Sequence, residues 1–148
     1  MQAFVSYRQT GGDEDDIRQM LTTVCGALRD QEIEPFCTFF DAKLEPKYPR
    51  PKPRKFMDEA FRMIGDSDFL LVIQSSEARS EGMLMEVGYC LAKGIPVIVA
   101  THESVKHTYL PDMADVALVW NDYDDLTVVI KGGGLQSLHA QIVDGGRA

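Results

Sequence analysis

The sequence predicts an α/β fold, a three-layer sandwich in which helices cover both faces of a five-stranded parallel sheet. Two unbroken apolar runs, residues 69–73 and 96–100, show no polar alternation, which is typical of strands buried on both faces of such a sheet. Between them, apolar residues at helical spacing begin after Ser80 and end before Gly94, a common helix stop. Strand, helix and strand in this order predict a β-α-β unit with a right-handed crossover.

The other elements continue this alternation along the chain. Further strands are predicted at residues 3–7, 34–40 and 116–120. Helices are predicted after an acidic run at 13–16, at 56–64, at 124–130 and at 135–143, with a frayed end at 145–148. The helix after Ser80 is expected to bury one stripe of side chains, Met83, Val87, Cys90 and Leu91. A flavodoxin-like sheet of five parallel strands most often has the strand order 2-1-3-4-5.

Length and composition indicate one domain over residues 1–148 that binds neither nucleic acid nor a membrane. A chain of 148 residues with 45% hydrophobic and 26% charged residues is ordinary for a globular domain with its own core. The net charge of −8 argues against a nucleic-acid surface, which needs a basic face. No apolar run approaches the roughly 20 residues of a membrane span, and no targeting segment precedes the first strand.

The three cysteines, Cys25, Cys37 and Cys90, lie in apolar surroundings without CxxC spacing. An odd number of cysteines without metal-ligand spacing predicts buried, reduced thiols and a cytoplasmic protein. The three histidines also lack the spacing of metal ligands, so we expect no metal and no cofactor.

Residues 43–55 combine basic side chains with four prolines and predict an extended, exposed loop. Prolines at this density disfavour both helix and sheet. Two interpretations of the loop stay open: a solvated connector, or a mobile basic lid over an anionic substrate.

A ligand crevice is expected beyond the carboxyl ends of the first and third strands, where the strand order reverses. The loops there, residues 6–12 and 74–82, are rich in small and polar residues and lead into helices, so their backbone N–H groups can cradle an anion. Arg8 offers a guanidinium that suits a phosphate, with a surface ion pair as the alternative. Neither loop contains a Walker or GxGxxG motif, which argues against nucleotide triphosphatases and dinucleotide enzymes.

The sequence around Glu86 resembles that of a known enzyme superfamily. Residues 80–88 read SEGMLMEVG and are similar to the S-x-G-x-x-x-E-x-G signature of the nucleoside 2-deoxyribosyltransferases. The serine at position 80 resembles the 2′-deoxynucleoside 5′-phosphate N-hydrolase branch, because the transferases usually carry aspartate there. Ser6-Tyr7-Arg8 with the following glycine pair is similar to the phosphate loop of that branch. The resemblance extends over roughly residues 3–130.

The resemblance implies an enzyme without a cofactor that cleaves the N-glycosidic bond of a (deoxy)nucleoside 5′-monophosphate. It implies that Glu86 is the nucleophile and that Asp58 is the acid that assists the departing base. It also implies substrate contacts by five residues, Ser6, Arg8, Gly11, Ser80 and Gly82. The chemistry agrees with these residue types, because a close carboxylate stabilises or traps an oxocarbenium-like transition state.

The resemblance further implies a homodimer or a higher homo-oligomer, in which a neighbour's loop after the fourth strand completes the pocket. Ser104 and Thr108 are candidates in that loop. The superfamily usually has a tyrosine near the start of the first strand, where this chain has Gln2 or Ala3. This departure and the unusual loop at 43–55 leave the sugar preference, deoxyribose or ribose, open.

Three alternatives remain at this point. The first is a transferase that exchanges bases. The second is a Toll/interleukin-receptor domain, which is used for protein interaction or NAD cleavage. Residues 4–7 also resemble the first strand of such a domain. The third is a non-catalytic nucleotide-binding module in which Glu86 is a structural acid paired with a lysine. For Asp58, a solvated helix acid is a separate alternative to the catalytic role.

Overall fold

The computed structural model describes residues 1–9, 12–41, 52–132 and 134–145 and contains one parallel sheet of five strands in the order β2-β1-β3-β4-β5. All four neighbouring strand pairs are parallel. The strands are β1 (Gln2–Ser6), β2 (Glu34–Phe36), β3 (Phe69–Gln74), β4 (Val97–His102) and β5 (Val116–Trp120). The predicted fold class and strand order are confirmed.

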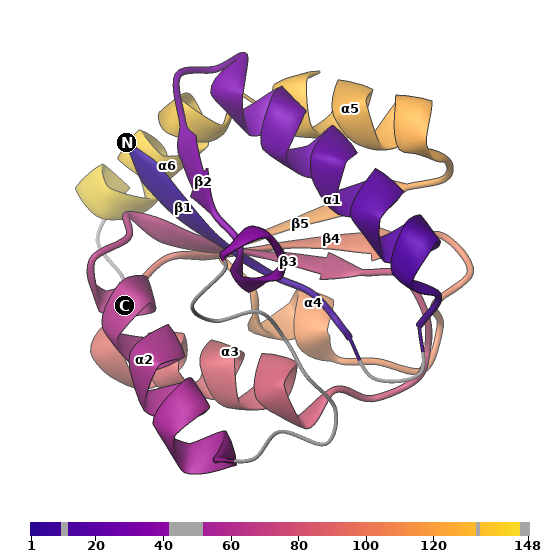
Figure 1. The fold of residues 1–148 in the computed structure, drawn as a ribbon. Coiled ribbons are helices and arrows are strands. Elements are labelled where there is room, and N and C mark those ends of the chain that lie inside the picture. The colour runs from indigo at the N-terminus through magenta and orange to yellow at the C-terminus, as the bar shows by residue number, and fades with distance from the viewer. Residues whose placement is uncertain (10–11, 42–51, 133, 146–148) are drawn as a thin grey trace.

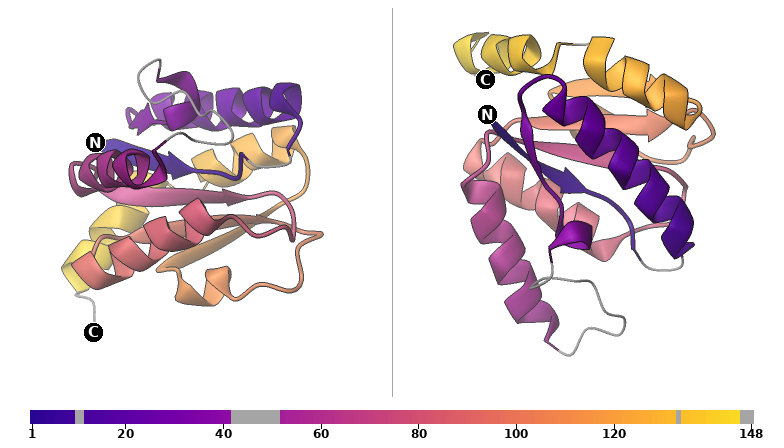
Figure 2. Two further views of the ribbon diagram at one scale, coloured as in Figure 1. Left: turned by 60° about the horizontal axis from the view of Figure 1, so that its bottom comes forward. Right: turned by 45° about the horizontal axis from the view of Figure 1, so that its top comes forward.

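Helices cover both faces of the sheet, as Figure 1 and Figure 2 show. The helices are α1 (Glu14–Arg29), α2 (Pro53–Gly65), α3 (Glu81–Lys93), α4 (Leu110–Met113), α5 (Tyr123–Gly132) and α6 (Leu135–Gly145). The first, fifth and sixth pack on one face, and the second, third and fourth on the other. Each face of the sheet therefore has its own hydrophobic core.

Alternate residues of the central strands supply the two cores. In β3, Phe69, Leu71 and Ile73 belong to the core under α1 and α5, whereas Leu70 and Val72 belong to the core under α2 and α3. All five side chains are fully buried. Because successive side chains of a strand point to opposite faces, a strand buried on both faces has no polar alternation, as the sequence predicted.

The predicted boundaries of α3 are close to those observed. Ser80 is the N-cap, and its side-chain oxygen accepts a hydrogen bond from the backbone N–H of Met83 at 3.2 Å. Gly94 ends the helix in the left-handed conformation with φ of 70°, which favours glycine. Leu91 does not face the core as expected: it is 45% exposed, although Met83, Val87 and Cys90 are buried.

Two predicted boundaries were wrong for local reasons. The second strand ends at Phe36, and the chain then turns into a short 3-10 helix, η1 (Thr38–Phe40). Helix α2 begins at Pro53, inside the loop predicted at 43–55. Proline is tolerated in the first turn of a helix because its missing N–H would be unpaired there anyway. Of that predicted loop, residues 43–51 lie outside the described residues.

The C-terminal part contains more helix than predicted. Helix α4 lies between the strands predicted at 96–100 and 116–120, where no helix was predicted, and has Pro111 in its first turn. Helix α5 continues to Gly132, and α6 includes Gly145, so the part of the predicted frayed end beyond it, residues 146–148, lies outside the described residues. No helix in the described part of the chain has the length and apolar character needed to cross a membrane.

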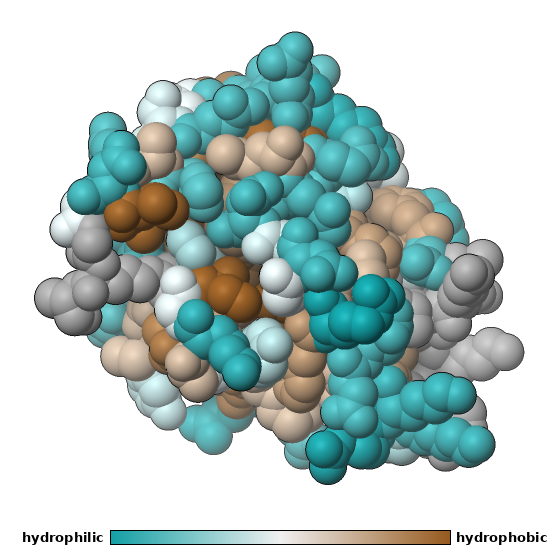
Figure 3. All heavy atoms as spheres, turned by 90° about the vertical axis from the view of Figure 1, so that its left-hand side faces the viewer, coloured by the Kyte–Doolittle hydropathy of each residue, from teal (hydrophilic) through white to brown (hydrophobic). Residues whose placement is uncertain are grey.

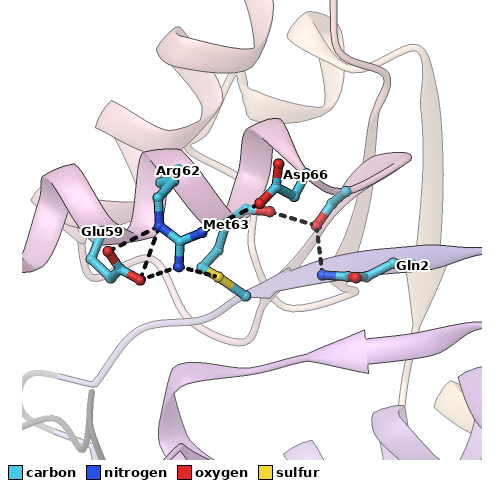
Figure 4. A network of polar contacts seen from close by, with 6 residues as sticks. Gln2, Glu59, Arg62, Met63 and Asp66 are labelled. Atoms are coloured by element: carbon cyan, nitrogen blue, oxygen red, sulfur yellow. Dashed lines mark hydrogen bonds and ion pairs between the residues drawn. The ribbon is translucent and has the colours of Figure 1, made fainter.

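Polar contacts hold the end of α2 beside the beginning of β1 (Figure 4). Arg62 contacts Glu59 one turn earlier and Asp66 one turn later, the latter at 3.4 Å. The amide nitrogen of Gln2 donates to the Ser67 hydroxyl at 3.4 Å. Figure 3 views this end of the molecule, where hydrophilic side chains cover most of the face and hydrophobic ones lie in small separate groups. The carboxyl ends of the strands, at the opposite end, carry the cavity.

Candidate active site

A cavity of about 470 Å³ lies beyond the carboxyl end of β1, between α2 and α3. The residues of β1 and its continuation that line it are Phe4, Val5, Ser6, Tyr7 and Gln9. The start of α2 contributes Pro53, Phe56 and Met57, and the start of α3 contributes residues 79–83, Met85 and Glu86. Since β1 and β3 are the strands between which the order reverses, the cavity occupies the predicted position. Its volume is ordinary for a small-molecule site.

Glu86 forms part of the cavity wall and is buried, with 7% of its surface exposed. It lies in the second turn of α3, on the side of the helix that packs against the sheet. The Ser6 hydroxyl donates a hydrogen bond to Glu86 Oε1 at 2.6 Å, and Ser6 is 1% exposed. A buried carboxylate must be hydrogen-bonded to remain stable, and the last residue of β1 supplies one of its donors.

The structure brings four of the predicted site residues together at this cavity. Ser6, Ser80, Gly82 and Glu86 all line it. At Gly82 an added Cβ would lie 3.9 Å from Met57 Sδ, so packing does not require glycine there. The absent side chain leaves the backbone at the start of α3 open to the cavity. Gly11 lies outside the described residues, and half-buried Arg8 is not among the residues that line the cavity.

Asp58 is not brought to Glu86. Its side chain is 56% exposed and accepts a hydrogen bond from Arg54 at 2.9 Å on the surface of α2. The preceding residue, Met57, is the one that faces the cavity. Successive residues of a helix point about 100° apart, and here Met57 points to the cavity whereas Asp58 points to solvent. In this structure Asp58 is therefore a solvated acid on the outer surface of α2.

Several cavity residues were not predicted from the sequence. Arg79 lies immediately before the N-cap of α3. Among the described residues that line the cavity, it is the one with a basic side chain. Phe56 was assigned to the apolar spacing of the helix predicted at 56–64 and Met57 was not singled out, but the two form an apolar wall of the cavity. Gln9 Oε1 is buried without a hydrogen-bond partner among the described residues, which leaves an acceptor available to a ligand.

The geometry of the cavity agrees with a comparison of the sequence with known families. Residues 10–136 match the nucleoside 2-deoxyribosyltransferase family. The chain belongs to this family. No curated protein matches the sequence.

Solved structures show that the family fold is shared at low sequence identity. A 2-deoxyribosyltransferase from Bacillus psychrosaccharolyticus is 15% identical, with a TM-score of 0.61 over 86% of this chain and 90% of that one. The CMP N-glycosidase BcmB from Clostridium botulinum is 15% identical, with a TM-score of 0.59 over 96% of this chain and 100% of that one. A conserved protein from Enterococcus faecalis V583 is 16% identical, with a TM-score of 0.60 over 90% and 99%.

A buried thiol pair lies behind the cavity in this family member. A hydrogen bond with Cys25, followed by burial, raises the pKa of Cys37 far above its ordinary value, and the charge of Glu86 adds to the effect. Cys37 is therefore a neutral thiol and a poor nucleophile at physiological pH. The described cavity wall contains two carboxyl groups, those of Glu81 and Glu86, and of these Glu86 is the buried one.

A smaller cavity of about 80 Å³ adjoins the first at the carboxyl ends of β3 and β4. Gln74 donates to the Thr108 hydroxyl at 3.0 Å, which ties the loop after β4 to the end of β3. Hydrogen bonds from the Lys106 backbone and from His107 lower the pKa of Glu77 on the facing loop. Arg79 and Ser80 line both cavities. The loop after β4 that contains Thr108 is therefore fixed beside the start of α3.

Proposed function

We propose that this chain cleaves the N-glycosidic bond of a (deoxy)nucleoside 5′-monophosphate with Glu86 as the nucleophile, releasing the nucleobase and a sugar phosphate. The observation that carries the proposal is the position of Glu86, a buried carboxylate in the wall of a cavity at the reversal point of the sheet. Membership of the family supports a reaction at a nucleosidic bond. The name of the neighbour BcmB, a CMP N-glycosidase, agrees with a monophosphate substrate for this fold.

The reaction follows from the chemistry of a buried carboxylate. One oxygen of Glu86 forms a bond to the anomeric carbon while the bond from that carbon to the base nitrogen breaks. The departing base takes up a proton, and the sugar phosphate stays attached to Glu86 as an ester. A water molecule then attacks the anomeric carbon and the bond from that carbon to the Glu86 oxygen breaks. The hydroxyl of the water stays on the sugar, and its other proton goes to solvent and replaces the proton that the base took from solvent. Glu86 returns to the carboxylate form.

The start of α3 is the proposed phosphate site. The first backbone N–H groups of a helix point along the axis toward an anion and lack intrahelical partners. Ser80 and Gly82 lie at this end of α3 and line the same cavity as Glu86. Arg79 adds a positive charge beside them. A phosphate bound there would hold the sugar near Glu86 and convert binding energy into orientation.

The apolar wall of the cavity is the proposed site of the nucleobase. Phe56 and Met57 of α2 face the start of α3 across the cavity, and Met85 lies on the same side as Glu86. An aromatic ring and thioether groups offer stacking surface to a planar base. Gln9 Oε1, which has no partner among the described residues, can accept a hydrogen bond from the substrate.

The proposal includes a homodimer or a higher homo-oligomer and a cytoplasmic location. Large apolar side chains are exposed on the outer surface of α3 and near α4, namely Leu84, Leu91, Tyr109 and Met113. A second copy of the chain would remove such side chains from water. The three cysteines are free and buried, in keeping with a reducing compartment.

Base release from a panel of substrates tests the proposal. The panel contains nucleoside 5′-monophosphates with ribose or deoxyribose, the corresponding nucleosides, and NAD, and the released base is measured by chromatography. We expect release from at least one monophosphate. Release from NAD alone would favour the Toll/interleukin-receptor alternative, and no release from any substrate would favour a binding module. In the presence of an excess of a different free base, we expect free sugar phosphate, whereas a new nucleotide would show base exchange.

Arg79→Ala should reduce the preference for monophosphates. A charge-assisted contact at the surface contributes about 1.5 kcal/mol, so kcat/KM for the monophosphate should fall roughly ten-fold, with little change for the nucleoside. Arg8→Ala is the matched comparison, because Arg8 does not line the cavity. A larger fall in kcat/KM for the monophosphate from Arg8→Ala than from Arg79→Ala would show that Arg8, and not Arg79, contacts the phosphate.

A further inference from the structure

The hydrogen bond between Ser6 and Glu86 connects two elements that are far apart in sequence. The hydroxyl oxygen of Ser6 lies 2.6 Å from Glu86 Oε1, and 80 positions separate the two residues. Both residues line the cavity and both are almost completely buried. A serine hydroxyl carries one proton, so while it donates to Glu86 it cannot also donate to a substrate phosphate.

The main chain at Ser6 is held firmly. Ser6 is the last residue of β1, which lies between β2 and β3 in the sheet, and it pairs with Val72 of β3. Figure 1 shows β1 inside the sheet, with α3 among the helices that cover one face. A hydroxyl on an interior strand is a donor of fixed position, in contrast to one on a loop.

We propose that Ser6 is a positioning residue for Glu86, rather than a phosphate contact, in the reaction proposed above. The hydroxyl fixes Oε1 and thereby the orientation of the carboxylate toward the substrate. It also favours the ionised form of a carboxyl group that burial would otherwise push toward the neutral form.

Ser6→Ala tests the proposal through both kcat and the pH profile. We expect kcat to fall about ten-fold at neutral pH with KM for the monophosphate little changed. The acid limb of the kcat/KM profile should move to higher pH by about one to two pH units, which corresponds to the loss of a hydrogen bond to a charged group. The other titratable groups that line the described cavity, Tyr7, Arg79 and Glu81, and the buried Cys37 thiol on which the charge of Glu86 acts, are the same in both proteins.

Ser6→Thr and Ser6→Val form a matched pair, because they have nearly the same shape and differ in the hydroxyl. Both side chains suit a β-strand, so the pair remains informative even if Ser6→Ala does not fold. Ser6→Thr should retain most of kcat and the wild-type acid limb, whereas Ser6→Val should behave as Ser6→Ala. Equal behaviour of Ser6→Thr and Ser6→Val would overturn the proposal.

Titration of the Glu86 carboxyl carbon by NMR separates this proposal from the proposed function. The resonance is assigned by its absence in Glu86→Gln, and no substrate is needed. We expect Glu86 to titrate at higher pH in Ser6→Val than in Ser6→Thr. An unchanged titration, with a raised KM for the monophosphate, would make Ser6 a phosphate contact. If the wild type releases no base, the proposed function fails, and the titration still decides whether Ser6 controls Glu86.

Discussion

Glu86→Gln should abolish base release while leaving the protein folded. The substitution keeps the size of the side chain but removes the negative charge that attacks the anomeric carbon. Loss of a nucleophile that forms a covalent intermediate lowers the rate by roughly a thousand-fold or more, or about 4 kcal/mol in activation free energy. The measurement is base release from the monophosphate found in the substrate panel, followed by chromatography.

The thermal melt of Glu86→Gln separates catalysis from structure. Glu86 is buried beside Ser6. Glutamine can still accept from the Ser6 hydroxyl, and a neutral amide is cheaper to bury than a charge. The melting temperature should therefore stay close to that of the wild type. Full activity of the variant would contradict the nucleophile assignment, and a collapsed melt would identify Glu86 as a structural acid.

Asp58→Asn is the matched change on a neighbouring helix. The exposed ion pair of Asp58 with Arg54 contributes little to stability because solvent screens it. We expect base release within a few-fold of the wild type. A loss comparable with that of Glu86→Gln would restore the acid role that the resemblance implied for Asp58.

The topology and the position of the cavity could be predicted because they depend on patterns that are local in sequence. The apolar runs at 69–73 and 96–100 indicated strands buried on both faces, and Ser80 and Gly94 closely marked the ends of the helix between them. Chain order and the reversal point then predicted the edge where the cavity lies. The signature of the family placed Glu86 on that edge.

The contacts inside the cavity could not be predicted from the sequence. They depend on how each helix is rotated about its axis and on which residues, far apart in sequence, the fold brings together. Asp58 and Met57 are adjacent in sequence, yet only Met57 faces the cavity, because the rotation of α2 about its own axis decides which of its side chains point there. A shift of a helix start by three residues leaves the periodic pattern intact, so the pattern does not reveal it. The partner of Ser6 lies 80 positions away, and no local spacing indicates it.

Ser80→Asp should reverse the substrate preference from monophosphates to nucleosides. Ser80 is the N-cap of α3, and aspartate caps a helix as well as serine does, so the helix should keep its stability. Its negative charge would lie beside the proposed phosphate site. At about 4 Å, repulsion between two unit charges is about 1 kcal/mol in bulk water and about 4 kcal/mol near a protein surface.

We therefore expect kcat/KM of Ser80→Asp for the monophosphate to fall by roughly five-fold to nearly a thousand-fold, with a much smaller change for the nucleoside. Ser80→Asn is the control, because it caps the helix with similar geometry and carries no charge. It should retain the monophosphate preference. The measurement is kcat/KM for a monophosphate and its nucleoside with all three proteins at two salt concentrations, because added salt weakens a repulsion between exposed charges. Equal losses for Ser80→Asp and Ser80→Asn would show that the shape of the cap matters, not its charge, and would move the phosphate away from the start of α3.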